Sequence, residues 1–146
     1  MEEAWVAYTD GSADHLADAA GWAAVLLRNG RLHLEVQGWA VGRDSAWAEL
    51  KAVCEVLASV PDGVRVVVHT DHFGFVEVFR GRGRLHRTDL RELWEGFRAE
   101  AKRRRLRLEL RYRRRQKTVW SRWVHRLANG ARLRALQVLG SDAKAA

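Results

Sequence analysis

The sequence predicts a single α/β domain in which a mixed five-stranded sheet is flanked by helices. Three observations predict this class: a strong hairpin signal near the N-terminus, a strand of the fully buried type in mid-chain, and apolar stripes with helical spacing. A chain of 146 residues that is 47% apolar is large enough to bury such a core. We expect the domain to span residues 1–140, followed by a short tail at residues 141–146.

The N-terminal part is expected to form an antiparallel meander of three strands. Residues 3–9 alternate between apolar and polar side chains, as a half-buried strand does. The next two segments, residues 20–28 and 31–40, flank Asn29-Gly30, the residue pair that two-residue hairpin turns favour. These patterns predict three consecutive antiparallel strands.

The centre of the chain predicts a helix followed by a parallel strand. The helix covers residues 45–59, with Asp44 or Ser45 as its N-terminal cap. Residues 64–70, VRVVVHT, form a nearly continuous β-branched run, typical of a central strand covered on both faces. Because a helix connects this strand to the meander, we expect parallel pairing and helices on both faces of the sheet. The apolar stripe of the helix consists of Trp47, Leu50, Cys54 and Leu57.

The second half predicts three more helices and one more strand. We expect a short helix over residues 72–79, a helix that begins near residue 88, a strand over 106–113 and a last helix over 119–139. The sheet then has three antiparallel strands followed by parallel ones. The apolar stripes of the two long helices are Leu90, Leu93, Trp94, Phe97 and Ala101, and Trp120, Trp123, Leu127 and Ala131.

The composition excludes several classes of protein. Cys54 is the single cysteine, so neither an internal disulfide nor a cysteine metal cluster can form. The sequence has no run of 18 apolar residues, and its first residues lack a basic segment followed by an apolar one. We therefore expect a soluble, cytoplasmic, monomeric protein that does not bind membranes.

Charge is divided unevenly along the chain. Residues 1–79 hold 5 Lys and Arg against 12 Asp and Glu, whereas residues 80–146 hold 21 against 6. Such a division is typical of an acidic centre in one half and a surface for polyanions in the other. A solvated basic face is the simpler alternative, unless the acidic half offers chemistry suited to nucleic acid.

Three carboxylates occupy similar positions in the predicted elements. Asp10 lies at the end of the first strand, Asp71 directly follows the fourth, and Glu49 lies early in the helix between them. Individually they are explained by a turn, a helix cap and a favourable helix dipole. If the two strands are parallel neighbours, however, all three meet, and clustered like charges need a cation. Hard oxygen ligands favour Mg²⁺ or Mn²⁺.

These residues carry a resemblance to a known family. YTDGS, the AEL of DSAWAELKAV, and VHTDHFGFV resemble, in order and spacing, three active-site blocks of the ribonuclease H family, and VHRLANGA is similar to the fourth. The resemblance covers nearly the whole chain. It implies a ribonuclease H-like five-stranded sheet and an endonuclease that cuts the RNA strand of RNA–DNA hybrids with two divalent ions, Mg²⁺ or Mn²⁺.

The resemblance also implies roles for particular residues. Asp10, Glu49 and Asp71 would be the catalytic metal ligands, with Asp10 shared between both ions. Gly11 and Ser12 would come close to the RNA strand, where 2′-hydroxyls distinguish RNA from DNA. The positions of Ser45 and His72 are those at which the family makes polar contacts to the hybrid, but the residues differ here, so substrate preference is open. A non-catalytic nucleic-acid-binding module and a nuclease for another duplex, such as double-stranded RNA, are alternatives.

The fourth carboxylate of the family falls at His125. A solvated helix histidine is the simple interpretation; the alternative is that His125 ligates metal or positions a water near the second ion. Imidazole suits Mn²⁺ better than Mg²⁺. We therefore expect higher activity with Mn²⁺ and a dependence on pH in the range where imidazole titrates.

Residues 101–117 form a basic segment with ten Lys and Arg. We expect it to contact nucleic acid near the acidic site, although charge on an edge strand also serves to prevent aggregation. The residues expected to bind phosphates are Arg113, Arg114, Arg115 and Lys117.

Overall fold

The computed structural model describes residues 3–114 and 118–145, and side chains as far as residue 140. Its elements follow the predicted order of three strands, a helix, a strand, two helices, a strand and a helix. They are β1 (Trp5–Asp14), β2 (Ala19–Arg28), β3 (Arg31–Val41), α1 (Ser45–Leu57), β4 (Arg65–Thr70), α2 (Phe73–Phe79), α3 (Thr88–Arg103), β5 (Arg107–Tyr112) and α4 (Val119–Ala145).

The sheet has the predicted mixed topology. Its strand order is β3-β2-β1-β4-β5. β1 pairs antiparallel with β2, and β2 with β3. β4 pairs parallel with both β1 and β5, so β1 joins the antiparallel part of the sheet to the parallel part. The prediction of three antiparallel strands followed by parallel strands is confirmed.

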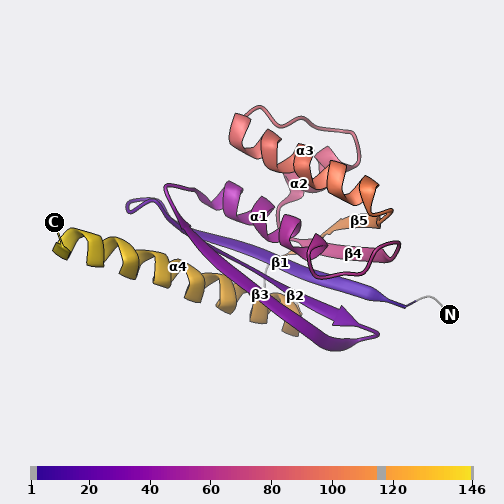
Figure 1. The fold of residues 1–146 in the computed structure, drawn as a ribbon, viewed down its shortest axis with the longest axis horizontal. Coiled ribbons are helices and arrows are strands. Elements are labelled where there is room, and N and C mark those ends of the chain that lie inside the picture. Colours follow the sequence, from indigo (N-terminus) through magenta and orange to yellow (C-terminus); the bar gives the residue numbers. More distant parts are fainter. Residues whose placement is uncertain (1–2, 115–117, 146) are drawn as a thin grey trace.

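Helices cover both faces of the sheet, as Figure 1 shows. α4 packs against β1, β2 and β3, and α1 packs on the opposite face against β1, β2 and β4. α3 lies over α1, and Trp94 and Phe97 of α3 join Leu50 and Val53 of α1 in the largest apolar core. A second core between α4 and the sheet includes Val124. The predicted α/β layers are therefore present.

Two element boundaries differ from the prediction. β1 does not stop after residue 9 but continues to Asp14, because its pairing with β2 extends from Trp5 as far as Asp14. α4 does not end near residue 139 but continues to Ala145, so residues 141–145 are helical. Gly11-Ser12 and Gly140-Ser141 both favour turns. Pairing with β2 keeps the first pair in a strand, and the second pair lies within the continuous helix α4.

The buried faces of two helices are shifted from the predicted stripes, although Leu50, Leu57 and Ala131 are buried as predicted. In α1 the residues Trp47 and Cys54 are only partly buried, while Ala48 and Val53 are fully buried. Trp123 was predicted to face inward on α4, but 37% of it is exposed, and its Nε1 donates a hydrogen bond of 2.6 Å to Glu35 on β3. Within the described ranges, no helix has the length and apolar character needed to cross a membrane.

Candidate active site

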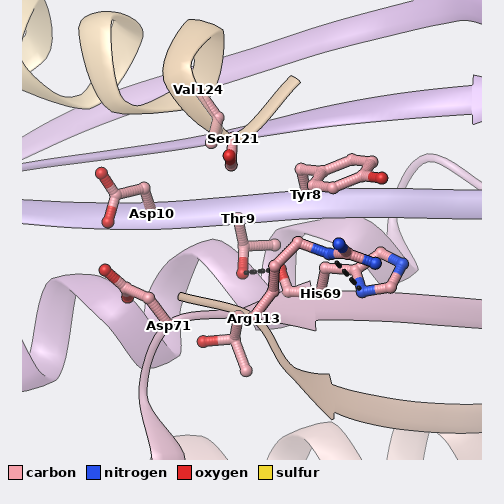
Figure 2. Close-up of a pocket in the computed structure, with 9 residues that line it drawn as sticks. Tyr8, Thr9, Asp10, His69, Asp71, Arg113, Ser121 and Val124 are labelled. Carbon is pink, nitrogen blue, oxygen red and sulfur yellow. Dashed lines mark hydrogen bonds between the residues drawn. The ribbon is translucent and has the colours of Figure 1, made fainter. Parts of the chain in front are cut away.

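The register of two parallel strands brings Asp10 and Asp71 together. Tyr8 of β1 is paired with His69 of β4, and each aspartate lies two residues beyond its member of that pair. Figure 2 shows the two carboxylates facing each other. Asp10 is not at the end of β1, as predicted, but inside it: pairing with β4 stops at Tyr8, while pairing with β2 continues past Asp10, which lies opposite Ala23. Asp10 thus lies two residues beyond the end of the parallel pairing.

Glu49 reaches this pair because Gly11 has no side chain. A Cβ atom at Gly11 would lie 2.4 Å from the backbone nitrogen of Glu49 and 2.6 Å from the carbonyl carbon of Ala48. α1 therefore rests directly on the backbone of β1. The helix is held at its start by Asp44, whose carboxylate accepts a hydrogen bond of 3.0 Å from the backbone nitrogen of Trp47. Glu49 lies less than two helical turns after Asp44, and this position places it next to Asp10.

The three carboxylates form a tight, partly dehydrated cluster. One oxygen from each of Asp10, Glu49 and Asp71 lies within 4.8 Å of the others. Asp10 and Glu49 are 3% and 5% exposed. Burial, and then the charges of Asp10 and Asp71, raise the pKa of Glu49 well above its ordinary value. The buried Oε2 atom of Glu49 has no hydrogen-bond partner.

This chemistry fits a divalent cation. Carboxylate oxygens are the ligands that Mg²⁺ and Mn²⁺ prefer. A buried acceptor without a donor and a group of like charges are both unfavourable unless a positive charge is supplied. The predicted convergence of Asp10, Glu49 and Asp71 is present in the fold.

His125 also lies at the cluster, on the α4 side. Its Nδ1 is 2.7 Å from Oδ2 of Asp10, and its Nε2 is 3.2 Å from Nδ2 of Asn129. The Asn129 side chain in turn accepts a hydrogen bond of 2.7 Å at Oδ1 from the hydroxyl of Ser12. A continuous hydrogen-bonded chain therefore connects Ser12 to Asp10. Asn129 was not among the predicted site residues; its signal in the sequence is a spacing of four from His125, which places both on one helix face.

An aromatic and basic group borders the acidic cluster in the same pocket. The His69 ring stacks on Tyr8 with centroids 4.7 Å apart, and Arg113 Nε donates to His69 Nδ1 at 3.4 Å, as the dashed line in Figure 2 marks. Burial, and then the charges of Arg113 and Arg111, lower the pKa of His69 to about 4. His69 is therefore neutral at physiological pH and is a fixed acceptor that holds Arg113 beside the site. Tyr8 and His69 were not among the predicted site residues.

Several residues predicted to bind nucleic acid have partners within the protein. Gly11 is buried beneath α1 rather than open to a ligand, and Ser12 is bonded to Asn129. His72 caps α2, where its Nδ1 accepts a hydrogen bond of 3.2 Å from the backbone nitrogen of Phe75. Ser45 is half-buried at the first position of α1. Gly11, Ser12 and His72 therefore have structural roles in the fold.

The basic segment is divided between the two ends of β5. Since β5 runs parallel to β4, its C-terminal end lies beside the acidic cluster and residues 101–107 lie at the far end. Arg103 forms an ion pair with Glu100. Arg104 pairs with Asp62 at 2.7 Å and donates to the backbone carbonyls of Leu57, the last residue of α1, and of Val60. Arg104, whose side chain is 12% exposed, therefore stabilises the fold.

Only the C-terminal part of the segment lies near the site. Among the described residues it contributes Arg113, which lines the pocket with Asp10 and Asp71, and Arg114, which is exposed. The predicted phosphate ligands Arg115 and Lys117 lie outside the described residues. The prediction that the basic segment contacts nucleic acid stays a prediction, and Arg113 and Arg114 are the described residues that lie at the near end.

Comparison with known proteins identifies the fold. No family model and no curated protein matches the sequence. Among solved structures, the N-terminal RNase H domain of Rv2228c from Mycobacterium tuberculosis superimposes with a TM-score of 0.80 at 22% identity, over 92% of this chain and 96% of that one. LC11-RNase H1, isolated from compost and solved in complex with an RNA/DNA hybrid, gives 0.79 at 21% identity, over 90% and 99%.

A third structure extends the likeness to another domain of life. RNase H1 from the halophilic archaeon Halobacterium salinarum NRC-1 gives a TM-score of 0.75 at 19% identity, over 87% of this chain and 96% of that one. In these comparisons the shared region covers 87–92% of this chain and 96–99% of the other chains. The chain therefore has the ribonuclease H fold.

Proposed function

We propose that this protein is a metal-dependent endonuclease of the ribonuclease H family that hydrolyses the RNA strand of RNA–DNA hybrids. The observation that carries the proposal is the convergence of Asp10, Glu49 and Asp71 within 4.8 Å at the end of the β1–β4 pairing. The similarity to a ribonuclease H1 solved with an RNA/DNA hybrid supports the same class of substrate.

The residues of the site would have two roles, metal binding and contact with the phosphate backbone. Asp10, Glu49 and Asp71 would hold two divalent ions, and His125 would complete the site from α4. Bound ions would supply Lewis-acid activation of water and stabilise the charge on the leaving oxygen. Arg113, held by His69 at the same pocket, would place a positive charge where the phosphate backbone enters.

Cleavage assays with labelled duplexes test this proposal. RNA–DNA hybrid, double-stranded RNA and double-stranded DNA are each incubated with the protein in Mg²⁺ and in Mn²⁺, and Asp10→Asn is the control. We expect cutting of the RNA strand of the hybrid and loss of cutting in Asp10→Asn. Tight binding without cutting would instead indicate a binding module, and preferential cutting of double-stranded RNA a different nuclease. Cutting that survives in Asp10→Asn would refute the assigned site.

The identity of the metal ion is expected to depend on His125. If His125 ligates an ion through an unprotonated ring nitrogen, the wild-type protein should cut faster in Mn²⁺, because imidazole suits Mn²⁺ better than Mg²⁺. The preference should disappear in His125→Ala, measured as the ratio of initial rates in the two metals. Equal rates that are unchanged by the substitution would exclude direct ligation of the metal by His125.

The salt dependence of binding is expected to identify the basic surface used. Each phosphate contact contributes about 1 to the slope of log affinity against log salt. In an Asp10→Asn background, Arg114→Ala should reduce this slope by about 1 for a hybrid duplex. The matched control is Lys102→Ala, an exposed position in the last turn of α3 at the opposite end of β5. Equal effects of both substitutions would contradict the proposal that phosphates bind at the end of β5 beside the acidic cluster.

A further inference from the structure

The hydrogen-bonded chain from Ser12 to Asp10 has a defined direction. A carboxylate only accepts hydrogen bonds, so at 2.7 Å from Asp10 Oδ2 the Nδ1 atom of His125 carries the hydrogen. In a neutral imidazole the other ring nitrogen, Nε2, is then an acceptor. Its partner is Nδ2 of Asn129, which is a donor.

The far side of Asn129 is consistent with this direction. With its amide nitrogen turned toward His125, the amide oxygen faces Ser12, whose hydroxyl donates to it at 2.7 Å. Every donor in this series of hydrogen bonds thus points toward Asp10. The three side chains come from β1 and α4, which pack against each other, so the arrangement is held by tertiary packing as well as by hydrogen bonds.

We propose that Asn129, supported by Ser12, is a positioning residue that holds His125 as the tautomer with hydrogen on Nδ1 and turns that nitrogen toward the acidic cluster. The imidazole would otherwise be able to rotate and present either nitrogen to Asp10. The hydrogen bond that one nitrogen of a histidine makes determines which nitrogen carries the hydrogen. Because a protonated Nδ1 cannot ligate a metal ion, His125 in this tautomer acts on the site by orienting Asp10. In this protein Asn129 makes the hydrogen bond to the other nitrogen, Nε2. The role in catalysis rests on the proposed nuclease function, but the tautomer does not.

Nuclear magnetic resonance of the metal-free protein tests the proposal directly. With ¹⁵N-labelled protein at a pH where imidazole is neutral, we expect His125 Nδ1 to resonate as the protonated nitrogen and Nε2 as the unprotonated one. A scalar coupling through the hydrogen bond should connect Nε2 to the side-chain nitrogen of Asn129. A protonated Nε2 in the wild-type protein, or absence of this coupling, would overturn the proposal.

Two substitutions at Asn129 separate positioning from a purely structural role. Asn129→Leu keeps a similar volume but removes the donor to Nε2, so the Nδ1 and Nε2 resonances of His125 should shift toward an average over the two tautomers. Asn129→Asp replaces the donor with an acceptor, so Nε2 should become protonated. The matched control is Gly130→Ala, on the same turn of α4 with no atom within 4 Å of the added Cβ, which should leave the His125 spectrum unchanged. An unaltered His125 spectrum in Asn129→Asp would contradict the proposal.

Measurements of kcat and KM test whether the orientation of His125 by Asn129 contributes to catalysis. Loss of a partner that orients a group at a metal site typically lowers activity by about 10- to 100-fold. We expect a fall of about 10-fold in kcat for Asn129→Leu, with KM for the hybrid little changed and with Gly130→Ala at the wild-type rate. If the protein cuts no hybrid at all, the nuclease proposal fails and the spectra still decide the tautomer. A wild-type kcat in Asn129→Leu, with the expected spectra, would refute the link to catalysis.

Discussion

Replacing Glu49 with glutamine is expected to abolish cleavage and, at the same time, to make the metal-free protein more stable. A metal ligand supports several kcal/mol of transition-state stabilisation, so we expect the rate to fall by about 10³-fold. Stability should rise because the charged form of Glu49 is disfavoured in the fold by burial and by Asp10 and Asp71. The glutamine amide offers hydrogens to these same carboxylates.

The stability gain has a defined dependence on pH. The pKa of Glu49 is raised on folding, so its ionisation costs nothing below the ordinary glutamate pKa and destabilises the fold increasingly as the pH rises above it. Glu49→Gln and wild type should therefore unfold at the same temperature near pH 4 and diverge toward pH 8. Each unit of displaced pKa corresponds to about 1.4 kcal/mol, and 1 kcal/mol shifts Tm by about 2–4 °C in a chain of this size.

Thermal unfolding in a chelating buffer, recorded from pH 4 to pH 8, measures this effect. Glu95→Gln, an exposed position on α3, is the matched control and should show no such divergence. Adding Mg²⁺ or Mn²⁺ at pH 8 should stabilise the wild-type protein more than Glu49→Gln, because the wild type binds the ion more tightly. A lower Tm for Glu49→Gln at pH 8 would show that the carboxylates do not repel each other as inferred.

Replacing Gly11 with alanine is expected to damage the fold and the site together. The added Cβ would meet two backbone atoms of α1 at 2.4 and 2.6 Å, and neither belongs to a side chain that could rotate away. Overpacking of this kind costs about 1–3 kcal/mol. Because α1 must move away from β1, Glu49 moves away from Asp10, and a displacement of about 1 Å can lower a rate by about 10²-fold.

Thermal unfolding and hybrid cleavage measure the two effects of Gly11→Ala. The control is Gly96→Ala in α3, where the new Cβ has no atom within 4 Å. Alanine is a better helix former than glycine by about 0.5–1 kcal/mol, so this control should unfold at a slightly higher temperature. Wild-type stability together with wild-type activity in Gly11→Ala would mean that α1 does not rest on β1 as described.

The parts of the fold that local patterns specify were predicted well. The Asn29-Gly30 hairpin, the buried run of β4 and the helical stripe of α3 each depend on neighbouring residues, and all are present. The acidic cluster was predictable because strand order and parallel pairing place Asp10 beside Asp71. What these predictions share is that one stretch of sequence, or one rule of strand pairing, suffices.

The remaining features depend on contacts between distant segments. Gly11-Ser12 is ordinary turn chemistry, yet pairing with β2 keeps it in a strand, and the need for glycine arises from α1. Arg104 looked like part of a nucleic-acid surface, but it pairs with Asp62, 42 positions earlier. The bond between Ser12 and Asn129 joins residues 117 positions apart. No local pattern contains such information.

The continuation of β1 through Asp10 has a consequence for the entropy of metal binding. The backbone of Asp10 is held on one side by β2, and its side chain is held by His125. Ordering a residue costs about 1–2 kcal/mol in conformational entropy, and for Asp10 this loss is complete once the sheet has formed. The carboxylate of Asp10 is therefore preorganised for an ion, and ordering this residue costs little of the free energy of metal binding.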